Sequence, residues 1–260
     1  MPERLGIRPP VQLQGLRIDN LTVGEAVELI VDSIASGRGG WVLTPNVDIL
    51  RQIDADAELA ALAAGAPLSL CDGMPLVWAS RLQGTPLVAR VAMSEMVFPL
   101  SRAAARHGLS CYLLGDRPDV ARDAAAALVA HAPGLAIAGM HSPPPGFEGE
   151  PRLRDEMVAD LERCSPDIVI CALGFPKQER LMAELSPIFP VTWFLAAGAT
   201  LSMAAGRTPP APPWMRRAGL EWLHRLRLEP RRLAGRYLVR DVPFALRLMW
   251  VSARVGSRRR

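Results

Sequence analysis

Short apolar runs recur along the first ~200 residues and alternate with amphipathic stretches. Each run is too short for a buried helix, and most end at Gly, Pro or Asp, which is typical of buried strands. An opening strand or hairpin is expected over 11–19. We expect further strands at WVLT (41–44), LSLC (68–71), CYLLG (111–115), LAIAGM (135–140), DIVICALG (167–174) and VTWFLAAG (191–198).

The stretches between these runs carry apolar residues at helical spacing. Thr22 and Glu25 have the spacing of a capping box, which predicts a helix through about Ser36. Ser94 is a candidate N-cap for a helix that ends at His107, and further helices are expected over 47–53, 56–64, 118–130 and 153–161. This alternation predicts an α/β fold with a mostly parallel, Rossmann-like sheet and helices on both faces.

The composition changes near Ala204. The segment AAGRTPPAPPW is rich in proline and predicts a stiff, extended connector. Beyond it we expect a helix over 214–228 and another that begins at Pro230. The chain therefore divides into an α/β domain over residues 1–206 and a basic helical appendage over residues 207–260, which is short for an independent core.

Charge is segregated along the chain. Residues 207–260 contain 14 Arg and 3 acidic residues, whereas residues 1–206 contain 16 basic and 23 acidic residues. Such a basic segment predicts an anionic partner, either phospholipid, diphosphate or nucleic acid. Arg232, Arg236 and Arg240 recur every fourth residue and would share one helical face. That face is either an ordinary solvated surface or one that meets diphosphate and lipid headgroups, with apolar neighbours in the membrane interface.

Several familiar chemistries leave no trace in the sequence. There is no GxGxxG, GxxxxGK[ST] or GxSxG motif, and the four histidines lie far apart. A transferase without a metal would have to neutralise its leaving diphosphate with cationic side chains or amide groups. The cysteines form no CxxC pair and are expected to be reduced and buried; they are Cys71, Cys111, Cys164 and Cys171.

Membrane insertion is not expected from the sequence. The N-terminal MPERLGIRPP has no apolar signal core. The chain also has no uninterrupted apolar run of about 20 residues. These features predict neither a secretory leader nor a membrane-spanning helix.

Polar residues follow the predicted strands where parallel sheets bind ligands. Asp72 comes directly after LSLC, where it could accept a proton from an attacking hydroxyl; the alternative is an ordinary Asp-Gly turn. Asn46 could bind a base, ribose or sugar hydroxyl, or simply cap a helix. Lys177 could contact phosphate or be solvated. The strand-end candidates are Thr44–Asn46, Asp72–Gly73, Gly115–Asp116, Gly174–Glu179 and Gly198–Thr200.

Segments in this order match one enzyme family over roughly residues 12–250. The matching motifs are Thr44-Pro45-Asn46, Asp72-Gly73 with Val77-Trp78, Arg90-Val91, LGFPKQE (173–179), AGATLSMAAG (197–206), Ala211-Pro212 with Trp214, and GLEWLHRLRLEPRRLAGRYL (219–238). By these motifs the chain resembles the WecG/TagA/CpsF glycosyltransferase family (glycosyltransferase family 26).

The resemblance implies an inverting transferase that moves a hexose-type unit from a UDP-sugar donor to a polyprenyl-diphosphate-linked acceptor sugar, without a metal or other cofactor. Members of the family act at the cytoplasmic membrane face, as peripheral proteins that help make teichoic-acid linkage units, enterobacterial common antigen or exopolysaccharide. An anionic membrane surface is then an expected partner and nucleic acid is not. The resemblance leaves a homo-oligomer open.

The resemblance also implies roles for individual residues. It makes Asp72 the base. It assigns substrate binding to Thr44, Asn46, Gly73, Arg90, Gly174, Lys177, Gln178 and Glu179. It matches the appendage arginines, which close over the site and hold diphosphate, to Arg225, Arg232 and Arg236.

The chain departs from the family pattern at several positions. Met93 and Glu95 stand where Gly and Asp are common, Leu201–Ser202 replaces Phe-Asp, and Pro210 replaces an Arg. The first two changes would reshape a sugar pocket by about a methylene. They disfavour an N-acetylmannosamine donor and leave glucose and glucuronic acid donors open.

Two other classes of function are weighed against a transferase. The basic tail could recruit a non-catalytic scaffold to a polysaccharide-assembly complex at the membrane, although the intact TPN, DG and PKQE segments disfavour this. A nucleic-acid-binding tail would more often carry exposed aromatic and Lys residues. The tail contains no lysine, because Lys177 is the sole lysine in the chain.

Overall fold

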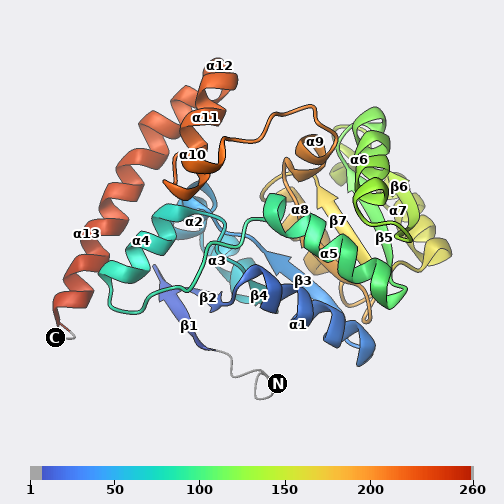
Figure 1. Cartoon of the computed structure of the whole chain (residues 1–260), viewed down its shortest axis with the longest axis horizontal. Helices are drawn as coiled ribbons and strands as arrows, with labels where there is room; N and C mark the ends of the chain where they lie inside the picture. The colour runs from blue at the N-terminus through green and yellow to red at the C-terminus, as the bar shows by residue number, and fades with distance from the viewer. Residues whose placement is uncertain (1–7, 259–260) are drawn as a thin grey trace.

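The computed structural model describes residues 8–258, apart from the side chains of residues 213 and 217. The N-terminal residues expected to carry no signal core therefore lie mostly outside it. At the centre is a six-stranded parallel sheet with the order β4-β3-β8-β7-β5-β6 (Figure 1). The strands are β3 (Gly40–Leu43), β4 (Leu68–Ser69), β5 (Ser110–Gly115), β6 (Ala136–His141), β7 (Ile168–Ala172) and β8 (Trp193–Ala196). The predicted parallel α/β sheet is thus confirmed.

Helices cover both faces of the sheet because its strands are apolar on both sides. In β7, Ile168 and Ile170 belong to one hydrophobic cluster, whereas Val169 and Cys171 belong to the other. The first cluster takes in α1 (Val23–Ala35), α5 (Met93–His107), α6 (Pro118–His131) and α9 (Thr200–Ala204). The second takes in α2 (Val47–Ala55), α3 (Ala57–Ala64), α4 (Met74–Leu82), α7 (Pro151–Cys164) and α8 (Lys177–Leu185).

Local signals place several of these elements as expected. The predicted hairpin is β1 (Arg8–Leu13) paired antiparallel with β2 (Leu16–Asn20), a sheet of its own. Thr22 and Glu25 form the predicted capping box at α1. The predicted cap at Ser94 is wrong, because the cap position is Ala92 and α5 begins at Met93. A short 3₁₀ turn, η1 (Phe147–Gly149), precedes α7.

The C-terminal segment differs from the single helices predicted for it. The expected helix over 214–228 is broken into α10 (Pro213–Arg217) and α11 (Glu221–Leu228). Gly219 lies at the break with φ +69°, and a Cβ there would come within 2.7 Å of Met74 on α4. Close packing against α4 therefore explains the turn. The rest of the segment forms α12 (Pro230–Ala234), a π-helical turn η2 (Gly235–Asp241) and α13 (Val242–Arg258).

Helix α13 is part of the hydrophobic core rather than a free tail. It lies beside α4 at one end of the molecule (Figure 1). Phe244 and Leu248 are buried in the cluster that includes α4. A Cβ on Gly256 would come within 2.1 Å of the Leu82 carbonyl oxygen, so the two helices touch through backbone. Removing residues 207–260 would uncover this core, so we expect the remainder to be unstable.

We predict that Leu248→Ala lowers the free energy of unfolding by about 3 kcal/mol, because it leaves a cavity between α13 and α4. Leu246→Ala, on the same helix but with Leu246 67% exposed, is the matched control and should change it by less than about 0.5 kcal/mol. Urea unfolding of both variants measures the difference. Equal, small effects would show that α13 does not pack as described.

Candidate active site

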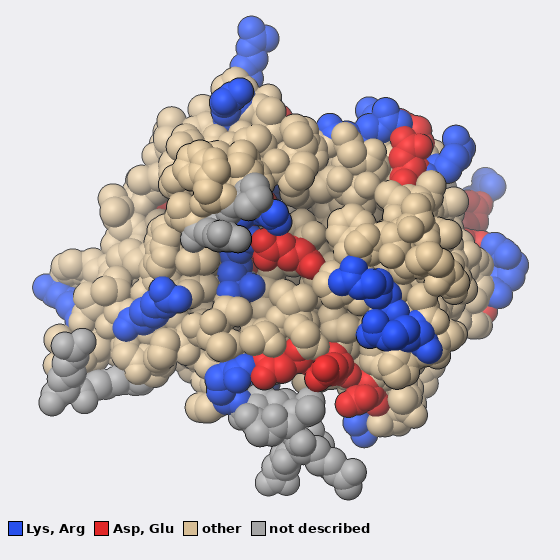
Figure 2. Space-filling model, in the orientation of Figure 1, with Lys and Arg blue, Asp and Glu red and all other residues tan. Residues whose placement is uncertain are grey.

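A cleft of about 830 Å³ opens at the carboxyl edge of the sheet. The sheet contributes the segments that follow β3, β4, β5, β7 and β8, and the C-terminal helices contribute the facing wall. Figure 2 shows acidic side chains flanked by basic ones near the middle of this face. The cleft thus brings together strand ends and arginines that are far apart in the sequence.

Asp72 is half-buried in this cleft, three residues after the end of β4. Its backbone N–H donates to the Pro45 carbonyl at 2.9 Å, which fixes it beside the end of β3. Within residues 8–258 its carboxylate has no hydrogen bond or ion pair. Burial raises the pKa of Asp72 to about 7, although the positive charge of Arg90 opposes the rise. The carboxyl group can therefore take up or release a proton near neutral pH.

Arg90 lies next to Asp72 and is bound by two other carboxylates. Its guanidinium donates to Glu221 at 2.8 Å and to Glu95 at 2.5 Å, and its side chain is 11% exposed. Arg216 adds a second positive charge 3.6 Å from Glu95. The result is an alternating cluster of charges in which Glu221 and Arg216 come from the C-terminal segment.

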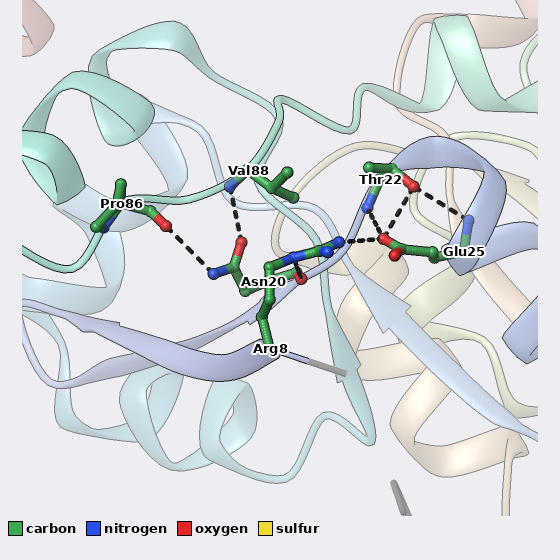
Figure 3. A network of polar contacts seen from close by, with 6 residues as sticks. All are labelled: Arg8, Asn20, Thr22, Glu25, Pro86 and Val88. Carbon is green, nitrogen blue, oxygen red and sulfur yellow. Dashed lines mark hydrogen bonds and ion pairs between the residues drawn. The ribbon is translucent and has the colours of Figure 1, made fainter. Parts of the chain in front are cut away.

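The loop that carries Arg90 is held by the N-terminal hairpin (Figure 3). Asn20, at the end of β2, accepts from the Val88 N–H at 2.7 Å and donates to the Pro86 carbonyl at 3.2 Å. Beyond them, the Val91 N–H donates to the Cys71 carbonyl at 2.7 Å. Arg90 is therefore anchored from both sides, next to the strand end that carries Asp72.

Thr44 and Asn46 line the cleft at the end of β3. The Thr44 hydroxyl donates to the Ala196 carbonyl at 3.3 Å, which ties it to β8. Asn46 is the N-cap of α2, where its Oδ1 accepts from the Ile49 N–H at 3.1 Å. Asn46 thus caps a helix, which was the alternative to ligand binding. Its amide nitrogen has no hydrogen-bond partner in the described part of the chain.

The segment after β7 divides into residues that reach the cleft and residues that do not. Gly174 and Gln178 line it, and the Gln178 Oε1 accepts from the Gly174 N–H at 3.1 Å. Lys177 instead points to Glu148, with 2.5 Å between its Nζ and the carboxylate. Glu179 is completely buried beneath Gln178, which donates to it at 3.0 Å. The structure does not bring Lys177 or Glu179 to the cleft wall.

All three predicted appendage arginines line the cleft: Arg225, Arg232 and Arg236. Arg236 lies over the Tyr237 ring, 4.9 Å from its centroid, and 3.6 Å from Asp48. The expectation that Arg240 shares their face is wrong. It lies on the exposed surface because the π-helical turn η2 breaks the four-residue spacing.

Several residues of the cleft received no role from the sequence. Glu221 is one of three acidic residues among 14 arginines, and that isolation was the available signal. Asp116 and Ser202 also line the cleft, and the Ser202 hydroxyl donates to Asp116 at 2.8 Å. Asp116 was noted at a strand end, but its partner lies 86 positions away.

The cleft can therefore combine a proton acceptor with anion binding. Asp72 supplies a carboxyl group that titrates near neutral pH, and four arginines line the walls around it besides Arg90. Among residues 8–258, no three His, Cys, Asp or Glu side chains are grouped so that they could hold a metal ion. The arrangement is suited to a reaction that removes a proton and stabilises negative charge on phosphate groups.

Comparison with known proteins gives a consistent result. A family model described as the glycosyl transferase WecG/TagA/CpsF family matches residues 11–259. An N-acetylglucosaminyldiphosphoundecaprenol N-acetyl-beta-D-mannosaminyltransferase from Bacillus subtilis (strain 168) is 28% identical over 192 residues, 74% of this chain and 73% of the relative. A protein of the same name from Bacillus spizizenii is 27% identical over 195 residues, 75% of this chain and 74% of the relative.

Glu179 generates a prediction about pH and stability. Burial raises its pKa from 4.5 to about 7, so the folded protein binds this proton more tightly than the unfolded chain. The stabilising effect of this proton is complete below about pH 4.5 and is lost as the pH rises through about 7. Glu179→Gln, which stays neutral, should be more stable than the wild type at pH 8 by on the order of 2 kcal/mol and nearly equal at pH 5.

Urea unfolding at the two pH values measures this difference. Glu184→Gln, on the same helix but exposed, is the matched control and should show no such pH dependence. A Glu179→Gln effect of equal size at both pH values would contradict the prediction.

Proposed function

Because the chain belongs to the WecG/TagA/CpsF family and is therefore a glycosyltransferase, we propose that it transfers a sugar from a UDP-sugar to a polyprenyl-diphosphate-linked acceptor sugar, with inversion. The observation that carries this proposal is the Asp72 carboxyl group, which faces a cleft lined by arginines and has no hydrogen-bond or ion-pair partner within residues 8–258. The product is a lipid-linked intermediate of a cell-surface polymer.

Asp72 acts as the general base in this reaction. It takes the proton of the acceptor hydroxyl, whose oxygen attacks the anomeric carbon of the donor. The new glycosidic bond forms as the bond to UDP breaks, and UDP leaves with the bonding electrons. Attack from the face opposite UDP inverts the anomeric centre. The Asn46 amide and the Thr44 hydroxyl, at the same strand edge, position the sugars.

Arginines supply the positive charge that the two diphosphates require. Arg225, Arg232 and Arg236 line the C-terminal wall, and Arg90 and Gln178 line the sheet wall. One guanidinium group can donate two hydrogen bonds to a pair of phosphate oxygens, and it stays charged at any working pH. The C-terminal arginines hold the lipid diphosphate and assist departure of UDP, and this chemistry requires no metal ion.

The relatives' names suggest UDP-N-acetylmannosamine as the donor and N-acetylglucosaminyl-diphosphoundecaprenol as the acceptor. The sequence departures at Met93 and Glu95 favoured a different donor. Met93 is buried in the core and Glu95 is bound to Arg90, whereas Ser94 between them lines the cleft. We therefore place UDP-N-acetylmannosamine first, with UDP-glucose and UDP-glucuronic acid as alternatives.

The C-terminal helices provide a surface for peripheral binding to the cytoplasmic face of the membrane. No helix among residues 8–258 is both long and apolar enough to cross a bilayer. In Figure 2 the surface over α10, α11 and α13 carries few charged side chains. The large exposed apolar residues of the C-terminal segment, including η2, are Trp214, Leu223, Leu228, Leu238, Val239, Val242, Leu246 and Trp250. Such side chains insert into the interface while neighbouring arginines meet anionic headgroups.

We predict UDP release with one donor of a panel of UDP-N-acetylmannosamine, UDP-glucose and UDP-glucuronic acid, in the presence of a short-chain polyprenyl-diphosphate N-acetylglucosamine.

Asp72→Asn should lower turnover by about 10²-fold or more while it remains folded. Wild-type turnover should rise from pH 6 to pH 8, since the Asp72 pKa of about 7 means that the base form gains population over this range. Turnover of Asp72→Asn close to that of the wild type would remove Asp72 from the mechanism. Membrane binding without release from any donor would favour the scaffold.

We also predict that Leu246→Ser with Trp250→Ser weakens co-sedimentation with vesicles of phosphatidylcholine and phosphatidylglycerol by about 10-fold, because two inserted apolar side chains are lost. The matched control is Ile188→Ser with Val191→Ser, which are also exposed but precede β8, at the amino ends of the strands and away from the cleft. The control should sediment like the wild type. Equal loss in both double variants would show that α13 is not the membrane-binding surface.

A further inference from the structure

The charge cluster around Arg90 links the C-terminal helices to the proposed base. We propose that Glu221 is a positioning residue that holds the Arg90 guanidinium away from Asp72. Asp72 then reaches its full strength as a base only when α11 is packed over the cleft. This inference rests on the proposed function, because it assigns to Glu221 a role in the chemistry of Asp72.

The hydrogen bonds of Arg90 carry the first step. One terminal nitrogen donates to Glu221 at 2.8 Å and the other donates to Glu95. Arg90 forms no ion pair with Asp72 in the described part of the chain, although its charge has the largest electrostatic effect on the Asp72 carboxyl group. A guanidinium that already binds two carboxylates gains little from a third ion pair, here with Asp72.

The balance of charges around Asp72 gives the second step. Arg90 and Glu95 face it from the loop after α4 and from α5, and Glu221 and Arg225 face it from α11. Arg216 lies behind Glu95, and the Cys71 thiol is neutral because burial raises its pKa to about 12. Two negative groups therefore offset the nearest two positive ones. Removing the Glu221 charge leaves an excess of positive charge beside the base.

The third observation is the position of Glu221 in the chain and the packing that brings it to Arg90. It is 131 positions from Arg90 and is the first residue of α11, directly after the break at Gly219. Gly219 packs against Met74 and Trp78 of α4, which begins two residues after Asp72. The same packing that seats α11 on the cleft therefore delivers the carboxylate to Arg90. A C-terminal segment that was not seated would leave Arg90 free to pair with Asp72 and weaken the base.

The test compares the pH dependence of turnover in the wild type, Glu221→Gln and Asp72→Asn, measured as UDP release with the donor that supports turnover in the panel above. In Glu221→Gln, we expect the acidic limb to shift to lower pH by about 0.5–1 unit, since the Asp72 pKa falls when a neighbouring negative charge is removed. Turnover at pH 8 should fall by about 3- to 10-fold, because a weaker base removes the acceptor proton less readily.

Companion variants separate charge from folding. Glu95→Gln removes the other carboxylate from Arg90 and should shift the limb in the same direction, which keeps the test open if Glu221→Gln does not fold. Glu221→Asp keeps the charge and should restore the limb towards its wild-type position. Glu156→Gln, which replaces an exposed carboxylate paired with Arg152 on α7, is the matched control and should leave the profile unchanged.

The outcomes distinguish this inference from the proposed function. An acidic limb that persists in Asp72→Asn with nearly full turnover overturns both, because Asp72 is then not the base. A limb that depends on Asp72 but keeps its position in both Glu221→Gln and Glu95→Gln overturns the role of Glu221 alone. Lower turnover with an unshifted limb is the signature of a purely structural Glu221 and also overturns the inference.

Discussion

A carboxylate surrounded by arginines is a stronger base when those arginines are bound elsewhere, since a close guanidinium lowers its pKa and so its affinity for a proton. The cleft meets this constraint by giving Arg90 two carboxylate partners, Glu95 and Glu221. Asp72 is left with burial as the dominant influence, which raises its pKa. The anchoring of the Arg90 loop by Asn20 serves the same end, because the balance depends on where one guanidinium is held.

The C-terminal segment is bound to the rest of the molecule by two different kinds of contact. Phe244 and Leu248 contribute apolar burial, which depends little on salt or pH. Toward the cleft, the contacts are ion pairs: Arg51 binds Asp241 at 3.2 Å, and Arg90 binds Glu221. Partly exposed ion pairs of this kind contribute little stability but fix relative position. The segment is thus held by its apolar helix and oriented by its charges.

Much of the fold and site followed from local pattern. Strand ends such as Thr44, Asp72 and Gly174 were predicted correctly to meet because parallel strands share one edge, and the family resemblance is confirmed. Contacts between distant segments did not follow. The Arg90–Glu221 pair, the π-helical turn at Gly235–Asp241 and the break at Gly219 all depend on how the C-terminal helices pack against α2, α4 and the Arg90 loop. Periodicity within one helix carries no information about that packing.

The same packing would let one short segment serve both ends of the amphiphilic acceptor proposed for this chain. In a polyprenyl-diphosphate sugar, the charged diphosphate lies directly between the sugar and the apolar chain. Helix α11 has a corresponding order: Arg225 faces the cleft, whereas Leu223 and Leu228 are exposed on the outer surface. A helix separates such faces by its own diameter of about 10 Å. A lipid headgroup can therefore enter the cleft while its chain stays in the bilayer, provided that the helix lies at the interface.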